Sequence, residues 1–314
     1  MTARPLRRAA LAASLALAAA ACGGQGAQSS ASTAASSAST ATRAAATTQA
    51  ARQASCTAGG LHTVEGGLLR MPSGAQPGRT PLLLVVIPGG NGDPGDRLGV
   101  GAAANRRGFA VLYPTSPGSG FWQLNDKFGT SDVTAVSGLI QRQVATGCFD
   151  QDRISITGVS NGAGFTARMG CKLPTTFAAV IPVAAGYRAL DPCPANARAS
   201  FLDIHGTADT VVPINGKKPA RKGNVARYTA RWARRDGCAA APRASSPRRL
   251  VTRFTYTGCD GGTRVERVRL TGTQHGWPGS NAGPRGRPPS ANPSGFSATT
   301  EVLRFIASAR RPGA

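Results

Sequence analysis

The stretch from Arg153 to Gly164 constrains the fold of this chain more than any other. A short β-type run ends in Gly158-Val159-Ser160-Asn161-Gly162, and a segment compatible with a helix follows. A serine on a tight turn between strand and helix needs very small neighbours, and its hydroxyl then projects above the sheet. The start of the helix adds a backbone N–H and a positive dipole end, which stabilise negative charge on a substrate oxygen. The pattern therefore predicts a nucleophile turn at Ser160, although a glycine-rich turn without chemistry has the same pattern.

Strand and helix patterns alternate around this turn. Continuous apolar runs such as residues 81–87 are typical of parallel strands that are buried on both faces. The sequence therefore predicts an α/β fold with a mostly parallel central sheet flanked by helices. The expected strands are residues 81–87, 109–114, 177–184, 201–205, 251–257 and 264–270, after an opening strand or hairpin at 61–70, and the expected helices are 97–107, 131–146, 224–235 and 297–309, beside the one that follows Ser160.

Two further polar residues follow predicted strands. Asp209 comes just after residues 201–205, and His275 lies in the glycine- and proline-rich loop that follows residues 264–270. Each has an ordinary explanation when taken alone, as a turn-capping carboxylate and a surface histidine. Together with Ser160 they occur in the chain order Ser, Asp, His, which is the order of α/β-hydrolases. We therefore expect a catalytic triad of Ser160, Asp209 and His275.

Two loops could complete such a site. Residues 88–93 follow a predicted strand directly, and their glycines would let backbone N–H groups face a substrate oxygen. We expect Asn161 and either Gly90 or Asn91 to provide the oxyanion hole. The tryptophans Trp122 and Trp277 are candidates for the walls of a substrate cleft, although either could instead cover the core.

The N-terminus differs in composition from the rest of the chain. Arginines precede an apolar run over residues 9–21 that stops at Cys22, and this resembles the signal peptide of bacterial lipoproteins. The resemblance implies cleavage and lipidation at Cys22, and therefore an extracellular or envelope protein anchored to the outer face of the cytoplasmic membrane. Residues 23–55 are almost entirely small or polar and predict a disordered linker. One catalytic domain is then expected over residues 56–314.

Without Cys22, the cysteines form an even set in a chain that we expect to be exported. Three disulfides are therefore expected rather than a metal site, because no metal-ligand spacing accompanies the cysteines. Six cysteines can pair in many ways, and the sequence alone does not choose between them. Proximity along the chain favours Cys171 with Cys193 and Cys238 with Cys259, which leaves Cys56 for Cys148.

The formal net charge of +23 raises nucleic acid as a partner. The arginines are spread along the chain, however, and no nucleic-acid motif accompanies them. We expect a solvated cationic surface that faces anionic envelope polymers or lipid headgroups, with no nucleic acid bound. The sequence indicates no cofactor, and it leaves the oligomeric state open.

Several of these motifs together resemble a known family, the secreted polyhydroxybutyrate depolymerase and feruloyl esterase-like group of α/β-hydrolases. The shared motifs are residues 158–162, His205-Gly206-Thr207-Ala208-Asp209 with Val212-Pro213, Asp236-Gly237-Cys238, Gly258-Cys259 and, most specifically, His275-Gly276-Trp277-Pro278-Gly279. The resemblance covers nearly all of residues 56–314 and supports pairing Cys238 with Cys259. Two positions depart from the family, since Pro88 stands in place of a histidine and Ala163 in place of a glycine.

The residues and the resemblance together predict a serine esterase that acts on carboxylic esters. Polyester, feruloylated or acetylated polysaccharide and small acyl esters all present similar carbonyl groups, so the natural substrate stays open. Two other functions also stay open, an envelope acyltransferase with the same triad and a noncatalytic envelope-binding lipoprotein.

Overall fold

The computed structural model describes Cys56 and residues 59–86, 96–118, 120–187, 190–216, 223–281 and 289–314. The chain divides into two units, residues 1–47 and 48–314, and all the described residues belong to the second. The expected signal peptide that ends at Cys22 and the expected linker 23–55 lie outside the described residues, so both stay predictions. In the described part, no helix combines the length and the apolar character needed to cross a membrane.

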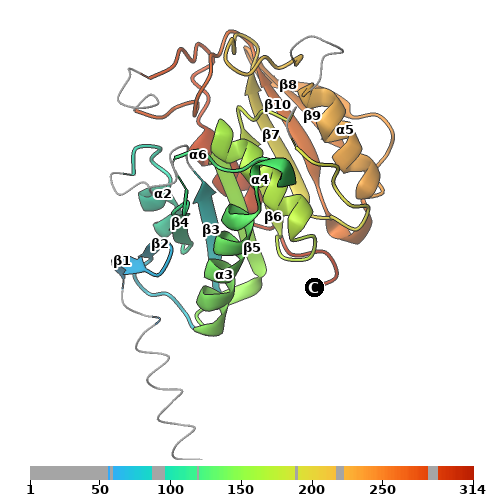
Figure 1. Cartoon of the computed structure of the whole chain (residues 1–314). Helices are drawn as coiled ribbons and strands as arrows, with labels where there is room; N and C mark the ends of the chain where they lie inside the picture. Colours follow the sequence, from blue (N-terminus) through green and yellow to red (C-terminus); the bar gives the residue numbers. More distant parts are fainter. Residues whose placement is uncertain are drawn as a thin grey trace, which may run out of the picture. The chain divides into compact units, whose positions relative to one another are not determined.

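One mixed sheet forms the centre of the described domain (Figure 1). Its strand order is β1-β2-β4-β3-β5-β6-β7-β10-β9-β8. The inner strands β4, β3, β5, β6, β7 and β10 are parallel to their neighbours within that group, and antiparallel strands extend the sheet at both ends. The strands are β1 (Gly60–Val64), β2 (Gly67–Met71), β3 (Thr80–Val86), β4 (Ala110–Pro114), β5 (Phe149–Val159), β6 (Ala179–Val183), β7 (Ser200–Gly206), β8 (Arg243–Arg248), β9 (Val251–Tyr256) and β10 (Val265–Leu270).

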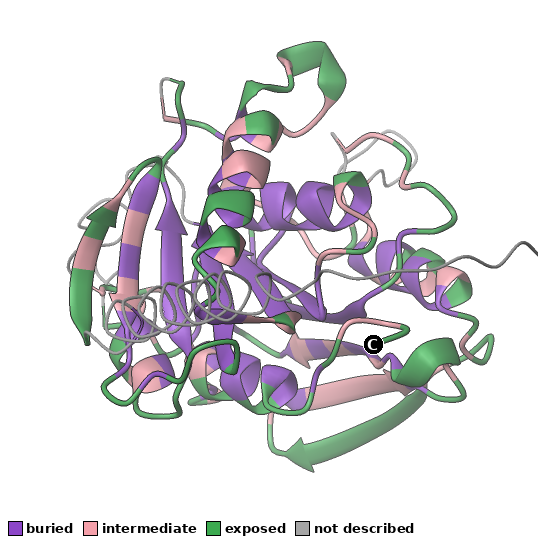
Figure 2. Cartoon of the chain, turned by 90° about the horizontal axis from the view of Figure 1, so that it is seen from below, coloured by how far each residue is buried: buried purple, intermediate pink, exposed green. Residues whose placement is uncertain are grey.

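Helices cover both faces of this sheet. Side chains of α3, α4 and α5 pack into one core cluster with alternate strand residues, and side chains of α2 and α6 pack into a second cluster on the other face. Figure 2 shows the result, with buried residues concentrated in the strands between the helices. The helices are α2 (Gly101–Asn105), α3 (Ser131–Ala145), α4 (Asn161–Lys172), α5 (Val225–Arg235) and α6 (Ala298–Ile306), with short 3-10 turns η1 (Asp126–Phe128) and η2 (Asp260–Gly262).

The apolar runs explain why the inner strands are parallel. Strands β3, β4, β6 and β7 are buried along their whole length, as parallel strands between two helical layers must be. The predicted α/β fold with a mostly parallel sheet flanked by helices is confirmed. Its consequence for function is that the C-terminal ends of β5, β7 and β10 meet at one edge of the sheet, where α/β folds place their sites.

Three elements differ from the sequence prediction. Strand β8 was not expected, because all six of its residues are exposed and carry no apolar pattern. Strand β5 begins at Phe149, earlier than the apolar residues suggested, since its first half contains polar residues. Helix α2 is shorter than the predicted helix 97–107. The residues of β8 and of the first half of β5 have exposed or polar side chains, for which apolar periodicity gives no signal.

The three expected disulfides are all present. Cys56 is bonded to Cys148, Cys171 to Cys193 and Cys238 to Cys259. The first joins the beginning of the described domain to the residue before β5, and the second ties the end of α4 to a later loop. The third fastens the end of α5 to the segment after β9. The pairing by proximity is therefore confirmed.

Removing the Cys56–Cys148 bond is expected to cost more stability than removing the Cys171–Cys193 bond. The first closes 92 residues and the second 22, and a longer closed loop restricts the unfolded chain more. With both cysteines of a pair changed to serine, we expect each loss to lie in the range of about 2 to 5 kcal/mol, with the first larger by about 1 kcal/mol. Urea unfolding of the two double variants measures the difference, and the reverse order would contradict it.

Candidate active site

Ser160 lies on the predicted turn between β5 and α4. Its backbone has φ 57° and ψ −121°, outside the regions that non-glycine residues ordinarily adopt. Its N–H donates to Val183 O of the neighbouring strand β6 at 3.0 Å, and its own carbonyl accepts from Gly164 N at 3.1 Å. Both contacts hold the serine in this conformation. Strain of this kind persists only where the surrounding structure fixes it, and it is typical of functional sites.

The turn has no room for a side chain at position 158, where the sequence has a glycine. A Cβ at this position would lie 2.5 Å from Val86 O, 2.7 Å from Thr166 Oγ1 and 2.8 Å from Gly162 O. All three distances are shorter than real Cβ contacts, and two of the three atoms belong to the backbone, which cannot move aside. The glycine therefore lets β3, β5 and α4 approach closely beneath Ser160.

The structure brings Ser160, His275 and Asp209 together from three separate parts of the chain. Ser160 Oγ lies 2.8 Å from His275 Nε2, and His275 Nδ1 lies 2.8 Å from Asp209 Oδ2. Asp209 and His275 follow β7 and β10, which are neighbours in the sheet, while Ser160 follows β5. With the proton on Nδ1, the imidazole donates to the carboxylate, and its Nε2 can accept the proton of the serine hydroxyl.

The carboxylate of Asp209 is buried and surrounded by donors. Its Oδ1 accepts from the backbone N–H groups of Val211 at 3.0 Å and Val212 at 2.7 Å. Burial alone would raise the pKa of Asp209, but hydrogen bonds from His205, His275 and Val212 outweigh it and hold the pKa well below the ordinary range. Asp209 is therefore an anion throughout the neutral and mildly acidic range.

A second imidazole contacts the same carboxylate. His205 Nε2 lies 3.3 Å from Asp209 Oδ2 and 2.8 Å from Val212 O, and its side chain is fully buried. Burial lowers the pKa of His205, but Asp209 and the nearby Asp203 raise it above the ordinary value. Sequence reasoning placed His205 at the end of a strand and in a shared motif with Asp209, but it assigned His205 no role. Its spacing of four residues before Asp209 was the available signal.

Further buried polar groups lie next to His205. Asp203, two residues earlier on β7, has an Oδ1 3.9 Å from His205 Nδ1, and its Oδ2 accepts a hydrogen bond from the Tyr187 hydroxyl. The ring of Tyr187 stacks on Tyr228 of α5 with ring centres 3.9 Å apart. The carboxylate of Asp209 is thus contacted by two imidazoles, those of His275 and His205.

One of the expected oxyanion donors belongs to the described residues, and the other two do not. Asn161 is the first residue of α4, and the first N–H groups of a helix have no acceptor within it. Its N–H therefore remains a candidate donor, as predicted. Gly90 and Asn91 lie outside the described residues, together with the departure from the family at Pro88, so their role stays a prediction.

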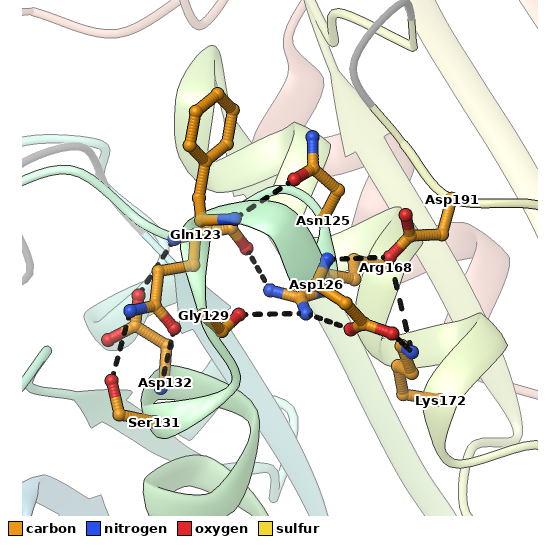
Figure 3. Close-up of polar contacts among 10 residues, drawn as sticks. Gln123, Asn125, Asp126, Gly129, Ser131, Asp132, Arg168, Lys172 and Asp191 are labelled. Atoms are coloured by element: carbon orange, nitrogen blue, oxygen red, sulfur yellow. Dashed lines mark hydrogen bonds and ion pairs between the residues drawn. The ribbon is translucent and has the colours of Figure 1, made fainter.

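The loop before α3 is fastened to the helix that carries the nucleophile turn. The side chain of Asn161 accepts from Trp122 N at 2.8 Å and donates to Trp122 O at 3.1 Å. Arg168, about two turns further along α4, donates to Gln123 O at 2.7 Å, Asp126 Oδ1 at 2.6 Å and Gly129 O at 3.0 Å (Figure 3). Sequence reasoning missed Arg168, because nothing in a helix pattern identifies the partner of a buried charge.

The two tryptophans proposed as cleft walls have different surroundings. Trp122 stacks on Phe165 of α4 and is almost fully buried, but it also lines a depression beside Asn161. Trp277 is buried in the core cluster beneath α6, and its indole N–H donates to Thr299 Oγ1 at 2.9 Å. These are contacts of a core residue, and a role of Trp277 as a cleft wall stays a prediction.

Comparison with known proteins shows which families this chain is similar to. Residues 67–190 match the family model described as esterase PHB depolymerase. They include the turn at Ser160 and the loop around Trp122. The sequence motifs resemble the same group, which includes polyhydroxybutyrate depolymerases.

Curated relatives and solved structures extend the match. The bifunctional acetylxylan esterase/xylanase XynS20E of Neocallimastix patriciarum is 26% identical over 176 residues, which are 55% of this chain and 25% of that protein. The probable feruloyl esterase C of Aspergillus terreus is 28% identical over 117 residues, 37% of this chain and 42% of that protein. The chain thus spans less than half the length of either relative.

A structure titled acetyl xylan esterase from Aspergillus awamori has a TM-score of 0.59 at 16% identity, over 79% of this chain and 99% of that one. At this identity the likeness concerns the fold alone, and that fold is the α/β-hydrolase fold.

Proposed function

We propose that this protein is a serine hydrolase of carboxylic esters. The observation that carries the proposal is the hydrogen-bonded line from Ser160 Oγ through His275 to Asp209, at 2.8 Å for each step. The match to an esterase family model and to relatives named as acetylxylan and feruloyl esterases supports the same reaction class. The triad roles and the substrate are our inference.

In the acylation step, Ser160 Oγ attacks the ester carbonyl carbon while His275 Nε2 takes the hydroxyl proton. The carbonyl oxygen becomes an oxyanion at the N-terminus of α4, where Asn161 N–H is the candidate donor. One well-aimed donor of this kind lowers the barrier by about 3 to 4 kcal/mol. The alcohol then leaves with the proton from His275, and the acyl group stays on Ser160.

In the deacylation step, His275 removes a proton from water, which attacks the acyl carbon. His275 then returns the proton to Ser160 Oγ as the bond between that oxygen and the acyl carbon breaks, and the acid is released. Asp209 holds the imidazole in the tautomer with the proton on Nδ1 and stabilises its cationic form. His205 and the N–H groups of Val211 and Val212 keep that carboxylate in place. The triad needs no cofactor for either step.

The location of the protein is part of the proposal. Three disulfides favour an oxidising compartment, so we infer that the domain works outside the cytoplasm. Attachment to the membrane through a lipid at Cys22 rests on the sequence of residues 1–22 alone.

A fluorophosphonate probe tests the nucleophile directly. The serine oxygen of an active triad attacks phosphorus and displaces fluoride, which leaves a stable phosphonate ester. We expect the mass of the probe on the peptide that contains Ser160, and no label on the peptide with the exposed Ser73. Protein that is unfolded before treatment should not react, because Ser160 depends on His275 for its reactivity. Equal labelling of folded and unfolded protein would contradict the proposal.

An acyltransferase would pass the same fluorophosphonate test. The product distinguishes the two reactions, since a transferase leaves the acyl group on an added sugar or lipid acceptor and releases little free acid. A noncatalytic envelope-binding protein would fail the test outright.

A further inference from the structure

Two phenylalanines near the nucleophile turn are unusually exposed. Phe121 and Phe128 each expose 62% of their surface, although large apolar residues are otherwise mostly buried in the described domain. Both line a depression of about 450 Å³, and Asn161, the residue next to Ser160, lines it too. The depression is therefore lined in part by the residue that follows the proposed nucleophile in sequence. None of the sequence motifs indicated these two rings.

The loop that carries the two rings is held in a fixed position. Arg168 is only 2% exposed, and its guanidinium bonds to three oxygens of this loop. Asp126, which lies between the two rings in sequence, also accepts from Lys172 Nζ at 2.6 Å, and its N–H donates to Asp191 (Figure 3). The hydrogen bonds that this buried guanidinium donates to the loop stabilise one loop conformation. A rigid loop presents its exposed rings without the entropy cost of ordering them on binding.

Asp132, a polar residue that also lines the depression, already has hydrogen-bond partners. Asp132 accepts from Ser116 Oγ through one oxygen and from Gln123 N through the other, each at 2.8 Å. A ligand in the depression would therefore meet two apolar rings and a carboxylate that is already hydrogen-bonded. Flat aromatic groups suit such a surface, because offset and edge-to-face ring contacts add to the burial of apolar area.

We propose that this depression, which we call the Phe121–Phe128 subsite, binds an aromatic ring of the ester substrate. The proposal rests on the proposed function, and it adds a substrate class, esters with a ring beyond the carbonyl. The ring can belong to the acid or to the alcohol, since both extend from a carbonyl held at Asn161. Simple acetyl esters would not reach the subsite.

Kinetics on three esters test the proposal. Methyl cinnamate places a ring in the acid, 2-phenylethyl acetate places it in the alcohol, and ethyl acetate has no ring. We expect Phe121→Ala and Phe128→Ala each to lower kcat/KM about tenfold for at least one ring-bearing ester, mainly through KM, because a lost apolar contact removes uniform binding. The values for ethyl acetate should stay within about twofold. The ester whose kcat/KM falls shows whether the bound ring belongs to the acid or to the alcohol.

Matched controls separate this effect from a general one. Leu61→Ala removes another exposed apolar side chain, on the edge strand β1, and should change none of the three esters. Phe121→Tyr keeps a ring and should retain the preference. Two outcomes would overturn the subsite. One is an equal loss of kcat/KM on all three esters, and the other is an unchanged ratio of kcat/KM between ring-bearing esters and ethyl acetate in both alanine variants.

A binding measurement keeps the result distinct from the proposed hydrolysis. Cinnamamide has the same ring, but its amide is far more resistant to hydrolysis than an ester, so calorimetric titration reports on the subsite alone. We expect weaker binding of cinnamamide to both alanine variants than to the wild type and to Leu61→Ala. Binding without any ester cleavage would support the subsite while contradicting the hydrolase proposal, and cleavage with no binding difference would do the opposite.

Discussion

Ser160→Ala is expected to abolish ester hydrolysis. Without the hydroxyl no acyl-enzyme can form, and loss of a triad nucleophile lowers kcat by about 10⁴-fold to 10⁶-fold even when the oxyanion donors and binding groups remain. Release of nitrophenolate from p-nitrophenyl acetate measures the loss. Alanine has the same Cβ as serine, so it meets the same backbone strain at φ 57° and should leave the fold intact.

Ser73→Ala is the matched control for this experiment. Ser73 is an exposed serine outside the site, so its variant should hydrolyse the ester at the wild-type rate. Circular dichroism and the thermal midpoint of both variants should match the wild type. A Ser160→Ala protein as active as the wild type would remove the basis of the proposed mechanism.

Asp209→Asn is expected to lower kcat by about 10⁴-fold, the effect of an asparagine that forces the wrong imidazole tautomer. The two backbone donors at Val211 and Val212 would keep the amide oxygen on their side. The amide NH₂ would then face His275 Nδ1 and His205 Nε2, which both point donors at the present carboxylate. His275 would have to place its proton on Nε2, where it could no longer accept from Ser160.

The same substitution has a signature in stability. Because the pKa of Asp209 in the folded protein lies below the ordinary value of 3.8, its ionisation contributes stability above about pH 4. That contribution is lost as the pH falls through the folded-state pKa. The wild type should therefore exceed Asp209→Asn in unfolding free energy at pH 7, and the difference should shrink in strong acid. A pH-independent difference in urea unfolding would show that the hydrogen bonds to the carboxylate do not stabilise its charged form.

The sequence predicted the parts of the site that depend on local backbone. Ser160, Asp209 and His275 each follow a strand, and parallel strands bring their C-terminal ends to one edge of the sheet, so chain order sufficed to group them. The contact between His205 and Asp209 was missed, although both stand in one shared motif, because a polar residue inside an apolar run gives no indication of what its side chain contacts.

The Phe121–Phe128 subsite was missed for a different reason. Whether a phenylalanine is buried depends on packing between α4 and a loop about forty residues earlier, and no local pattern encodes such a distance. The same limit applies to Trp277, whose neighbours on α6 follow it by more than twenty residues. Contacts between residues so far apart in the sequence form only in the tertiary structure.

The bond between Cys56 and Cys148 also determines how the domain would bear a mechanical load. A pull on the chain before Cys56 would pass through sulfur to Cys148, directly before the central strand β5, and would bypass the edge hairpin of β1 and β2. Edge hairpins peel one hydrogen bond at a time, whereas a strand with neighbours on both sides must break many bonds together. Strand β5 ends next to Ser160, so the nucleophile is carried by the strand that would take the load, and the bond would protect the edge hairpin from peeling.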